Sequence, residues 1–168
     1  QVEWLGRGAD LHPAQQVQRL SYHACMALWC GNNEVTEGWF NWGWQKQLKY
    51  NATDSARIWK SNKKLFEETI PFLLHKIQPD VAYWPSSPSI GWGHPEALRS
   101  GDVHYWGVWW GNEPFSNYVT HTGRFMTEYG FQSLPSMASL QKFIPKDSLF
   151  LLSSPLKTHQ KHPVGFET

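Results

Sequence analysis

The fold is decided by one stretch of the chain, Ala24-Cys25-Met26-Ala27-Leu28-Trp29-Cys30-Gly31-Asn32-Asn33-Glu34. Its first seven residues are continuously apolar and end at a glycine, a pattern typical of a strand buried on both faces of a parallel sheet. The odd spacing of Cys25 and Cys30 places them on opposite faces of that strand, so we expect two small buried residues without a disulfide. Glu34 follows at the carboxyl end of the strand.

The rest of the chain alternates between strand-like and helical runs. After the first strand we expect, in order, a helix from Glu34 to about Lys49, a helix capped by Asp54 that runs to Ile77 and is kinked or divided at Pro71, strands at 80–84, 102–106 and 124–128, and a helix from Ser136 to Phe143. A helix opened by His12-Pro13 precedes the first strand. The tail from Ser153 is polar and weakly patterned. This alternation favours an α/β fold with a parallel sheet.

Polar and aromatic residues gather just after each expected strand. In a (β/α)8 barrel this carboxyl-end face is where active sites form. Four strands cannot close such a barrel, which takes about 250 residues. We therefore expect the 168 residues to be part of a larger catalytic domain rather than an open sheet.

Composition narrows the possible partners. The formal net charge of +1 argues against general binding to nucleic acid or to a membrane surface. No stretch approaches the roughly 18 apolar residues of a membrane span, and the start Gln1-Val2-Glu3-Trp4 lacks the pattern of a signal peptide. The 11 Trp, 6 Tyr and 9 Phe often stand beside Gly, Asn, His and Pro. Such segments suit a pocket for a flat, partly apolar ligand such as a sugar, although core packing accounts for about half of these aromatics.

Two glutamates stand at the ends of expected strands. Glu34 follows Asn32 and Asn33, whose amides can donate and accept hydrogen bonds beside it, and Glu128 ends the run at 124–128. Two carboxyl groups at the same face of one sheet can flank a glycosidic bond, where one protonates the leaving oxygen and the other attacks the anomeric carbon. Spacing alone leaves a second interpretation open, in which Asn33-Glu34 merely starts a helix with a surface acid.

Longer motifs around both acids resemble one known family. Leu28–Glu34 (Leu-Trp-Cys-Gly-Asn-Asn-Glu) resembles the acid/base motif of glycoside hydrolase family 2, in the Gly-Asn-Asn-Glu form of its β-mannosidase branch. Arg124–Ser136 resembles the nucleophile motif of that branch, and Gly101–Gly111 is similar to its strand-6 segment. The Ser86-Ser87-Pro88-Ser89 loop also fits. Together the resemblance extends over about residues 13–160.

The resemblance implies the roles of the two acids. Glu34 would end strand 4 and Glu128 would end strand 7 of a (β/α)8 barrel, of which this chain supplies about strands 4 to 7 with their helices. Glu34 would be the acid/base and Glu128 the nucleophile of a retaining, exo-acting β-mannosidase, which releases terminal non-reducing β-D-mannose through a covalent glycosyl-enzyme. Asn33 would hydrogen-bond the sugar near its 2-hydroxyl. The implied partner is a β-mannoside or manno-oligosaccharide, and no cofactor is implied.

The resemblance also implies aromatic contacts to the substrate. Trp42 matches an aromatic wall of the −1 subsite, and His104 and Trp106 stand where strand-6 residues reach the pocket. Trp110, a further candidate for substrate binding, stands where a tyrosine is expected whose hydroxyl would orient the nucleophile. An indole offers only one N–H donor. Either another group, such as Tyr105, takes that role, or the nucleophile is held less well.

The resemblance further implies that β-sandwich domains and the remaining barrel strands lie outside this chain, whose partner would be the rest of the parent enzyme. Exposed sheet edges and half a core argue against activity of the chain alone. Family resemblance alone favours an extracytoplasmic location: periplasmic, secreted or lysosomal. Two alternatives stay open: another family 2 specificity, such as β-galactosidase or β-glucuronidase, and a non-catalytic carbohydrate-binding fragment.

Two other signals point to no further chemistry. Among the eight histidines, His159 and His162 are three residues apart, but they lack the flanking pattern of a zinc site, and we expect no metal. Asn51-Ala52-Thr53 matches the N-glycosylation triplet on an accessible loop, a match that also occurs often by chance.

Overall fold

The computed structural model describes residues 13–160 and residue 162. These residues form two compact units, the first made of residues 13–104 and 123–127 and the second of residues 105–122 and the described residues from Glu128 onward. Helices and a few short strands make up the described chain, so the expected mixed α/β class is confirmed. The first expected helix is present at residues 13–20, while His12 lies outside the described residues.

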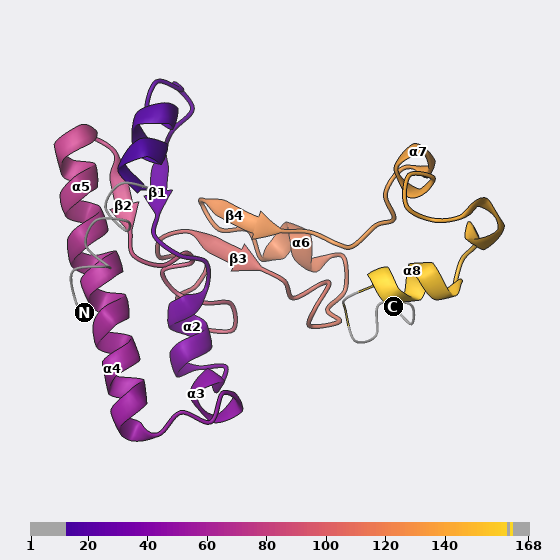
Figure 1. Cartoon of the computed structure of the whole chain (residues 1–168), viewed down its shortest axis with the longest axis horizontal. Coiled ribbons are helices and arrows are strands. Elements are labelled where there is room, and N and C mark those ends of the chain that lie inside the picture. Colours follow the sequence, from indigo (N-terminus) through magenta and orange to yellow (C-terminus); the bar gives the residue numbers. More distant parts are fainter. Residues whose placement is uncertain (1–12, 161, 163–168) are drawn as a thin grey trace. The chain divides into compact units, whose positions relative to one another are not determined.

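The expected parallel pairing of the first two strands is confirmed. β1 (Leu28–Cys30) runs parallel to β2 (Ala82–Trp84), with Trp29 opposite Tyr83 (Figure 1). β1 is shorter than the expected strand at 24–30, because the residues before it form turns. One of these turns is closed by the hydrogen bond from Met26 N to His23 O at 3.1 Å.

The expectation of two buried cysteines is wrong. Cys25 and Cys30 are both free and exposed. Cys25 falls in the turn before β1, and Cys30 is the last residue of a strand that lies in a two-stranded sheet. A sheet of two strands leaves parts of β1 without a covering layer. The burial of both cysteines was expected only because the residues around them form a continuous apolar run.

Two short helices replace the single helix that was expected after Glu34. α2 spans Val35–Phe40 and α3 spans Trp44–Gln47. Between them Gly43 has a φ of 75°, a left-handed conformation that ends a helix and that glycine adopts without steric cost. Lys49 also has a positive φ, of 56°, just after α3.

The long helix is continuous past its proline. α4 (Ala52–Lys63) leads through the π-helical turn η1 (Lys64–Thr69) into α5 (Ile70–Ile77), and the three lie in line in Figure 1. Pro71 is the second residue of α5, and the π turn lies directly before this helix, where the hydrogen bond that a proline cannot make would otherwise fall. The irregularity expected at Pro71 is therefore present as a π turn, and the helix continues beyond it.

The cap of α4 differs from the expected one by three residues. Asn51 is the N-cap: its Oδ1 accepts from Asp54 N at 2.8 Å, and its Nδ2 donates to Asp54 Oδ2 at 2.8 Å. Asp54, the expected cap, is therefore in the first turn and binds the true cap. Acidic residues in a first turn also interact favourably with the helix dipole.

The remaining strands form a separate sheet. β3 (Val103–Tyr105) pairs with β4 (Met126–Tyr129), and Val103 N donates to Phe125 O at 2.9 Å. The described residues thus contain two two-stranded sheets rather than one sheet of four strands. β3 is buried along its whole length.

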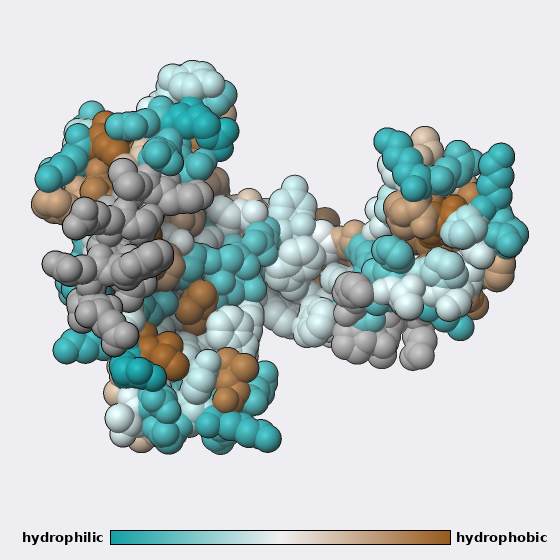
Figure 2. Space-filling view, in the orientation of Figure 1, coloured by the Kyte–Doolittle hydropathy of each residue, from teal (hydrophilic) through white to brown (hydrophobic). Residues whose placement is uncertain are grey.

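The second unit has a small apolar core of its own. α6 spans Asn117–Thr120, α7 spans Met137–Leu140, η2 spans Lys146–Ser148 and α8 spans Ser154–His159. Leu140, Ile144 and Leu156 form the core cluster, and Figure 2 shows apolar side chains gathered between polar ones around α7 and α8. Ser136 caps α7 as expected, since its side chain accepts from Ser139 N.

The sequence did not indicate α8. This helix buries one apolar residue, Leu156, and is too short to show a helical period. Pro155 in its first turn was the available signal. In the part of the chain that the structure describes, no helix combines the length and apolar character of a membrane span.

The cap of α4 can be tested by hydrogen exchange on the full-length protein. Asn51→Ala should make the first-turn amides of α4 exchange about fivefold faster, because losing a side-chain cap costs about 1 kcal/mol. Thr53→Ala is the matched control: it also destroys the Asn-x-Thr triplet but leaves Asn51 in place. Equal exchange in the two variants would show that Asn51 does not cap α4.

Candidate active site

Glu34 is fixed by a continuation of the parallel ladder beyond β1 and β2. Asn33 bridges to Ser87, Glu34 N donates to Ser87 O at 2.8 Å, and Ser87 N donates to Asn32 O at 2.9 Å. The acid therefore lies at the carboxyl end of the strand pair, as expected. A Cβ at Gly31 would lie 2.7 Å from Pro85 O, so the close approach of these two segments requires a glycine.

Asn32 organises the loop that carries Glu34. Its Nδ2 donates to Pro85 O at 2.8 Å, and its Oδ1 accepts from Ser86 Oγ at 2.8 Å and from Val35 N at 3.3 Å. Asn33, the candidate contact to the sugar 2-hydroxyl, is exposed beside it. That role for Asn33 stays a prediction.

Glu34 has an unusual backbone conformation. Its φ of 56° and ψ of 12° place it in the left-handed region, where a residue with a Cβ costs about 1–3 kcal/mol, and such strained residues cluster at functional sites. Glu34 is also the N-cap residue of α2, yet its side chain makes no capping hydrogen bond. The carboxylate is directed elsewhere.

The partner of the Glu34 carboxylate is a buried histidine. His104 is 2% exposed, and its Nδ1 lies 2.9 Å from Glu34 Oε1. The other ring nitrogen, Nε2, lies 2.9 Å from Ser87 Oγ and 3.8 Å from Asp102 Oδ2. The sequence placed His104 among the substrate contacts; the structure places it against the acid itself.

Asp102 is the most buried polar residue of the first unit, with 0% exposure. Its carboxylate accepts from Ser87 Oγ, from Ser89 N at 3.0 Å and from Thr127 Oγ1 at 2.8 Å. These donors come from the loop after β2 and from β4. Ser87 and Asp102 both stand in segments that carry the family resemblance, but the sequence analysis gave neither of them a role.

In the second unit, Glu128 has an indole donor. Trp106 Nε1 donates to Glu128 Oε2 at 3.2 Å. The hydroxyl of Tyr105 instead donates to Glu113. Burial, and secondly that hydrogen bond, raise the pKa of Tyr105 to about 12, while the same bond lowers the pKa of Glu113. The suggestion that Tyr105 orients Glu128 through its hydroxyl is therefore wrong, because its single proton is bound to Glu113.

Two of the candidate tryptophans have large exposed surfaces. Trp42 is 46% exposed and meets Trp44 edge-on, with ring centroids 5.9 Å apart. Trp110 is 56% exposed and meets His162 in the same way at 4.5 Å. Their contacts to a substrate stay predictions. Trp39, by contrast, is buried and stacks on Trp59.

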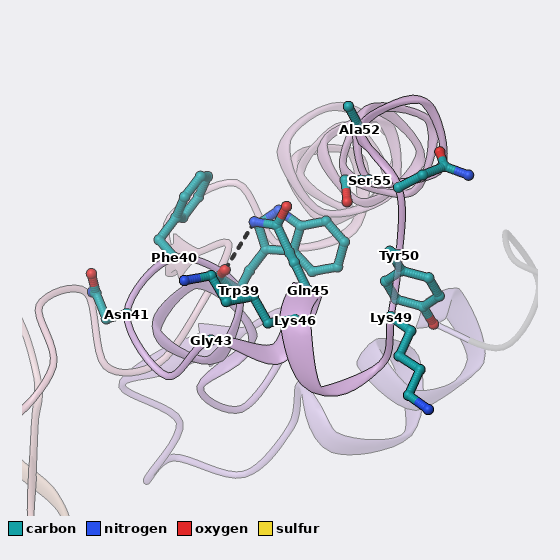
Figure 3. Close-up of a pocket in the computed structure, with 11 residues that line it drawn as sticks. Trp39, Phe40, Asn41, Gly43, Gln45, Lys46, Lys49, Tyr50, Ala52 and Ser55 are labelled. Atoms are coloured by element: carbon teal, nitrogen blue, oxygen red, sulfur yellow. Dashed lines mark hydrogen bonds between the residues drawn. The ribbon is translucent and has the colours of Figure 1, made fainter.

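A pocket of ≈ 650 Å³ lies at α2, α3 and the start of α4 (Figure 3). Trp39, Gln45, Lys49 and Tyr50 are among its lining residues, and Gln45 Nε2 donates to Trp39 O at 3.1 Å. None of the candidate site residues lines it. This hollow is therefore distinct from the region around Glu34 and His104.

Comparisons with known proteins agree on one group of relatives. The chain is similar to Beta-mannosidase B of Emericella nidulans (31% identical, 79% of this chain) and of Thermothelomyces thermophilus (28%, 78% of this chain). It spans 16% of the length of each. Among solved structures it is similar to a Beta-D-Mannosidase from Dictyoglomus thermophilum, with a TM-score of 0.69 and 29% identity over 94% of this chain and 18% of that one. No family model matches the chain.

The three donors around Asp102 predict a large loss of stability on its removal. In the full-length protein, Asp102→Ala should cost about 3 kcal/mol, because it removes the shared acceptor of three hydrogen bonds and leaves the buried Ser87 hydroxyl without this acceptor. Asp80→Ala, an exposed aspartate at the turn before β2, should change stability by less than about 0.5 kcal/mol. Thermal unfolding compares them, and equal midpoints would contradict the structural role of Asp102.

Proposed function

We propose that this chain, which belongs to the β-mannosidase branch of glycoside hydrolase family 2, carries the acid/base and the nucleophile of a retaining, exo-acting β-mannosidase. The proposal depends on one observation, the backbone conformation of Glu34 together with the partner of its carboxylate. It has a strained left-handed backbone at the end of β1, and its carboxylate meets buried His104 instead of capping α2. A surface acid at a helix start needs neither feature.

The proposed reaction has two steps. Glu34 protonates the glycosidic oxygen while Glu128 attacks the anomeric carbon, which releases the alcohol and leaves mannose bound covalently to Glu128. Glu34 then takes a proton from water, whose oxygen attacks the anomeric carbon and restores the free Glu128 carboxylate. Two inversions at one carbon retain its configuration. This chemistry requires carboxyl groups about 5–5.5 Å apart.

Contacts within each unit support the two roles. The Trp106 N–H on Glu128 Oε2 suits a carboxylate that must stay ionised and keep one orientation as a nucleophile. The hydroxyl of Thr127, the preceding residue in β4, donates to Asp102 Oδ2 at 2.8 Å and lies 3.3 Å from Val103 O as an alternative acceptor, which fixes the strand from which Glu128 projects. Preorganised nucleophiles need such support.

The proposed setting is a larger (β/α)8 barrel, to which this chain would contribute about strands 4 to 7. The match to the Dictyoglomus enzyme over 94% of this chain and 18% of that one supports this domain assignment. Exposed apolar side chains such as Phe72, Val119 and Leu151 also suit a chain that further segments cover. The proposed substrate is a terminal β-D-mannoside, with Asn33, Trp42 and Trp110 as contacts.

The role of Glu34 can be tested with two leaving groups. Glu34→Gln in the full-length protein should lose about 100-fold or more in kcat/KM on a methylphenyl β-mannoside, whose leaving group needs a proton. The loss on a dinitrophenyl β-mannoside, which needs none, should be much smaller. Glu37→Gln is the control, since this buried acid of α2 binds Gly91 N and Asn41 instead of His104.

The control variant should change both rates by the same factor. If Glu34→Gln also lowered both rates equally, Glu34 would not be the acid. If the wild-type protein cleaved only aryl β-galactosides or β-glucuronides, the mannose specificity would be wrong, and if it cleaved no aryl glycoside, the carbohydrate-binding alternative would remain.

The indole donor on Glu128 gives a separate prediction. Trp106→Phe should lower kcat by about 10-fold on both aryl β-mannosides, since a hydrogen bond to a charged group contributes about 1.5–3 kcal/mol. Trp110→Phe, an aromatic exchange in the same loop, should act on KM instead. Steady-state kinetics that showed an unchanged kcat in Trp106→Phe would contradict the proposed positioning of Glu128.

A further inference from the structure

A chain of buried hydrogen bonds runs inward from Glu34. It passes from the Glu34 carboxylate to His104, from His104 to Ser87, and from Ser87 to Asp102. His104 is 2% exposed, Ser87 7% and Asp102 0%, and all four residues belong to the first unit. His104, Ser87 and Asp102 are too buried for water to supply alternative partners freely. Each hydrogen bond in the series must therefore have one donor and one acceptor among these residues.

The Asp102 carboxylate determines where the hydroxyl proton of Ser87 lies. Its two carboxylate oxygens accept three hydrogen bonds, and a carboxylate only accepts. The single hydroxyl proton of Ser87 therefore points to Asp102. Ser87 Oγ can then face His104 only as an acceptor, so the Nε2 atom of His104 carries a proton.

The proton on His104 Nε2 determines which protonation states of Glu34 can form a hydrogen bond with His104. When His104 is neutral and protonated on Nε2, its Nδ1 presents a lone pair to Glu34 Oε1, and only a protonated Glu34 makes a hydrogen bond there. When Glu34 is ionised, the bond requires a second proton on His104. Besides the proton on Nε2, the two residues therefore share one proton between His104 Nδ1 and Glu34 Oε1.

We propose that Asp102 and Ser87 are positioning residues that fix the tautomer of His104, so that His104 and Glu34 share one proton and Glu34 is presented as an acid. The proposal rests on the proposed acid/base role of Glu34. After Glu34 has given its proton to the leaving oxygen, its carboxylate faces the Nδ1 lone pair. That repulsion favours the next step, in which Glu34 takes a proton from water.

The other titratable groups near these four residues fit this proton assignment. Burial raises the pKa of the Cys30 thiol, against a smaller opposite effect of its hydrogen bond with Ser87. Cys30 therefore stays an uncharged thiol at neutral pH. Asp102, the residue before β3, is the acid behind His104, with its Oδ2 3.8 Å from Nε2.

Asp102→Asn tests the proposal because the amide can bind in one orientation only. Ser89 N cannot reverse its bond, so the amide oxygen must take the Oδ1 position and the NH₂ group the Oδ2 position. The NH₂ group then donates to Ser87, whose proton turns to His104 Nε2. His104 becomes protonated on Nδ1 and donates to an ionised Glu34, so the acid is lost.

The expected result in the full-length protein is selective. Asp102→Asn should lose about 100-fold in kcat/KM on the methylphenyl β-mannoside and less than about threefold on the dinitrophenyl one. The high-pH limb of its kcat/KM profile should move to lower pH. Thr127→Val is the matched control: it removes another donor to Asp102 Oδ2 but leaves the Ser87 proton in place.

The control should keep the wild-type ratio between the two substrates and the wild-type pH limb. If Asp102→Asn behaved like Thr127→Val, the tautomer would not be set by Asp102, and the proposal would be overturned. In that case Glu34→Gln would still show its leaving-group selectivity, so the proposed function would stand. Loss of that selectivity in Glu34→Gln would instead overturn the function.

A second measurement is made on the wild-type protein, so it does not depend on whether a variant of these four residues folds or stays active. Solid-state ¹⁵N NMR of histidine-labelled wild-type protein, with His104→Gln used only to assign the signal, reports which ring nitrogen carries the proton. We expect the signal to show a proton on Nε2 of His104 in the active protein. A neutral His104 protonated on Nδ1 would overturn the proposal.

Discussion

The architecture around Glu34 depends on one buried carboxylate, Asp102. Taking an ionised carboxyl group out of water is costly unless hydrogen bonds replace its hydration, and here a backbone N–H and two hydroxyls do so. The donors come from the loop after β2 and from β4. Asp102 thereby joins segments far apart in the sequence at the place where β3 begins.

The position of His104 and the state of Glu34 follow from that junction. Ser87 is held by Asp102 on one side and by the backbone of Asn32 and Glu34 on the other. The imidazole of His104 fits between Ser87 and Glu34, and the Glu34 side chain turns to it rather than to the N-terminus of α2. The left-handed backbone of Glu34 is tolerated because several fixed contacts determine it.

Much of this arrangement could be predicted from the sequence, and the remainder has physical reasons for being missed. The apolar run before Gly31 predicted the parallel strand and placed Glu34 at its end. It did not predict how short β1 is or that Cys25 and Cys30 are exposed, because burial depends on which segments cover a strand. Local periodicity likewise does not predict which distant segments pair, so it did not predict two sheets of two strands.

The candidate site was predicted unevenly for the same reason. Glu34 and Glu128 stand in long motifs, but Ser87 and Asp102 act through contacts that only the fold creates. His104 was predicted as a substrate contact because the family resemblance places strand-6 residues at the pocket, and its burial against Glu34 gives it a different position. Helix α8 was missed since one buried leucine gives no period.

The assignment of Glu128 as nucleophile is tested most directly by trapping the covalent intermediate. The full-length protein would be incubated with a 2-deoxy-2-fluoro-β-mannosyl fluoride, which slows the second step more than it slows release of fluoride. Peptide mass spectrometry would then locate the sugar. A 2-fluoromannosyl group on Glu128 is the expected result; a label on any other residue, or turnover without any label, would contradict it.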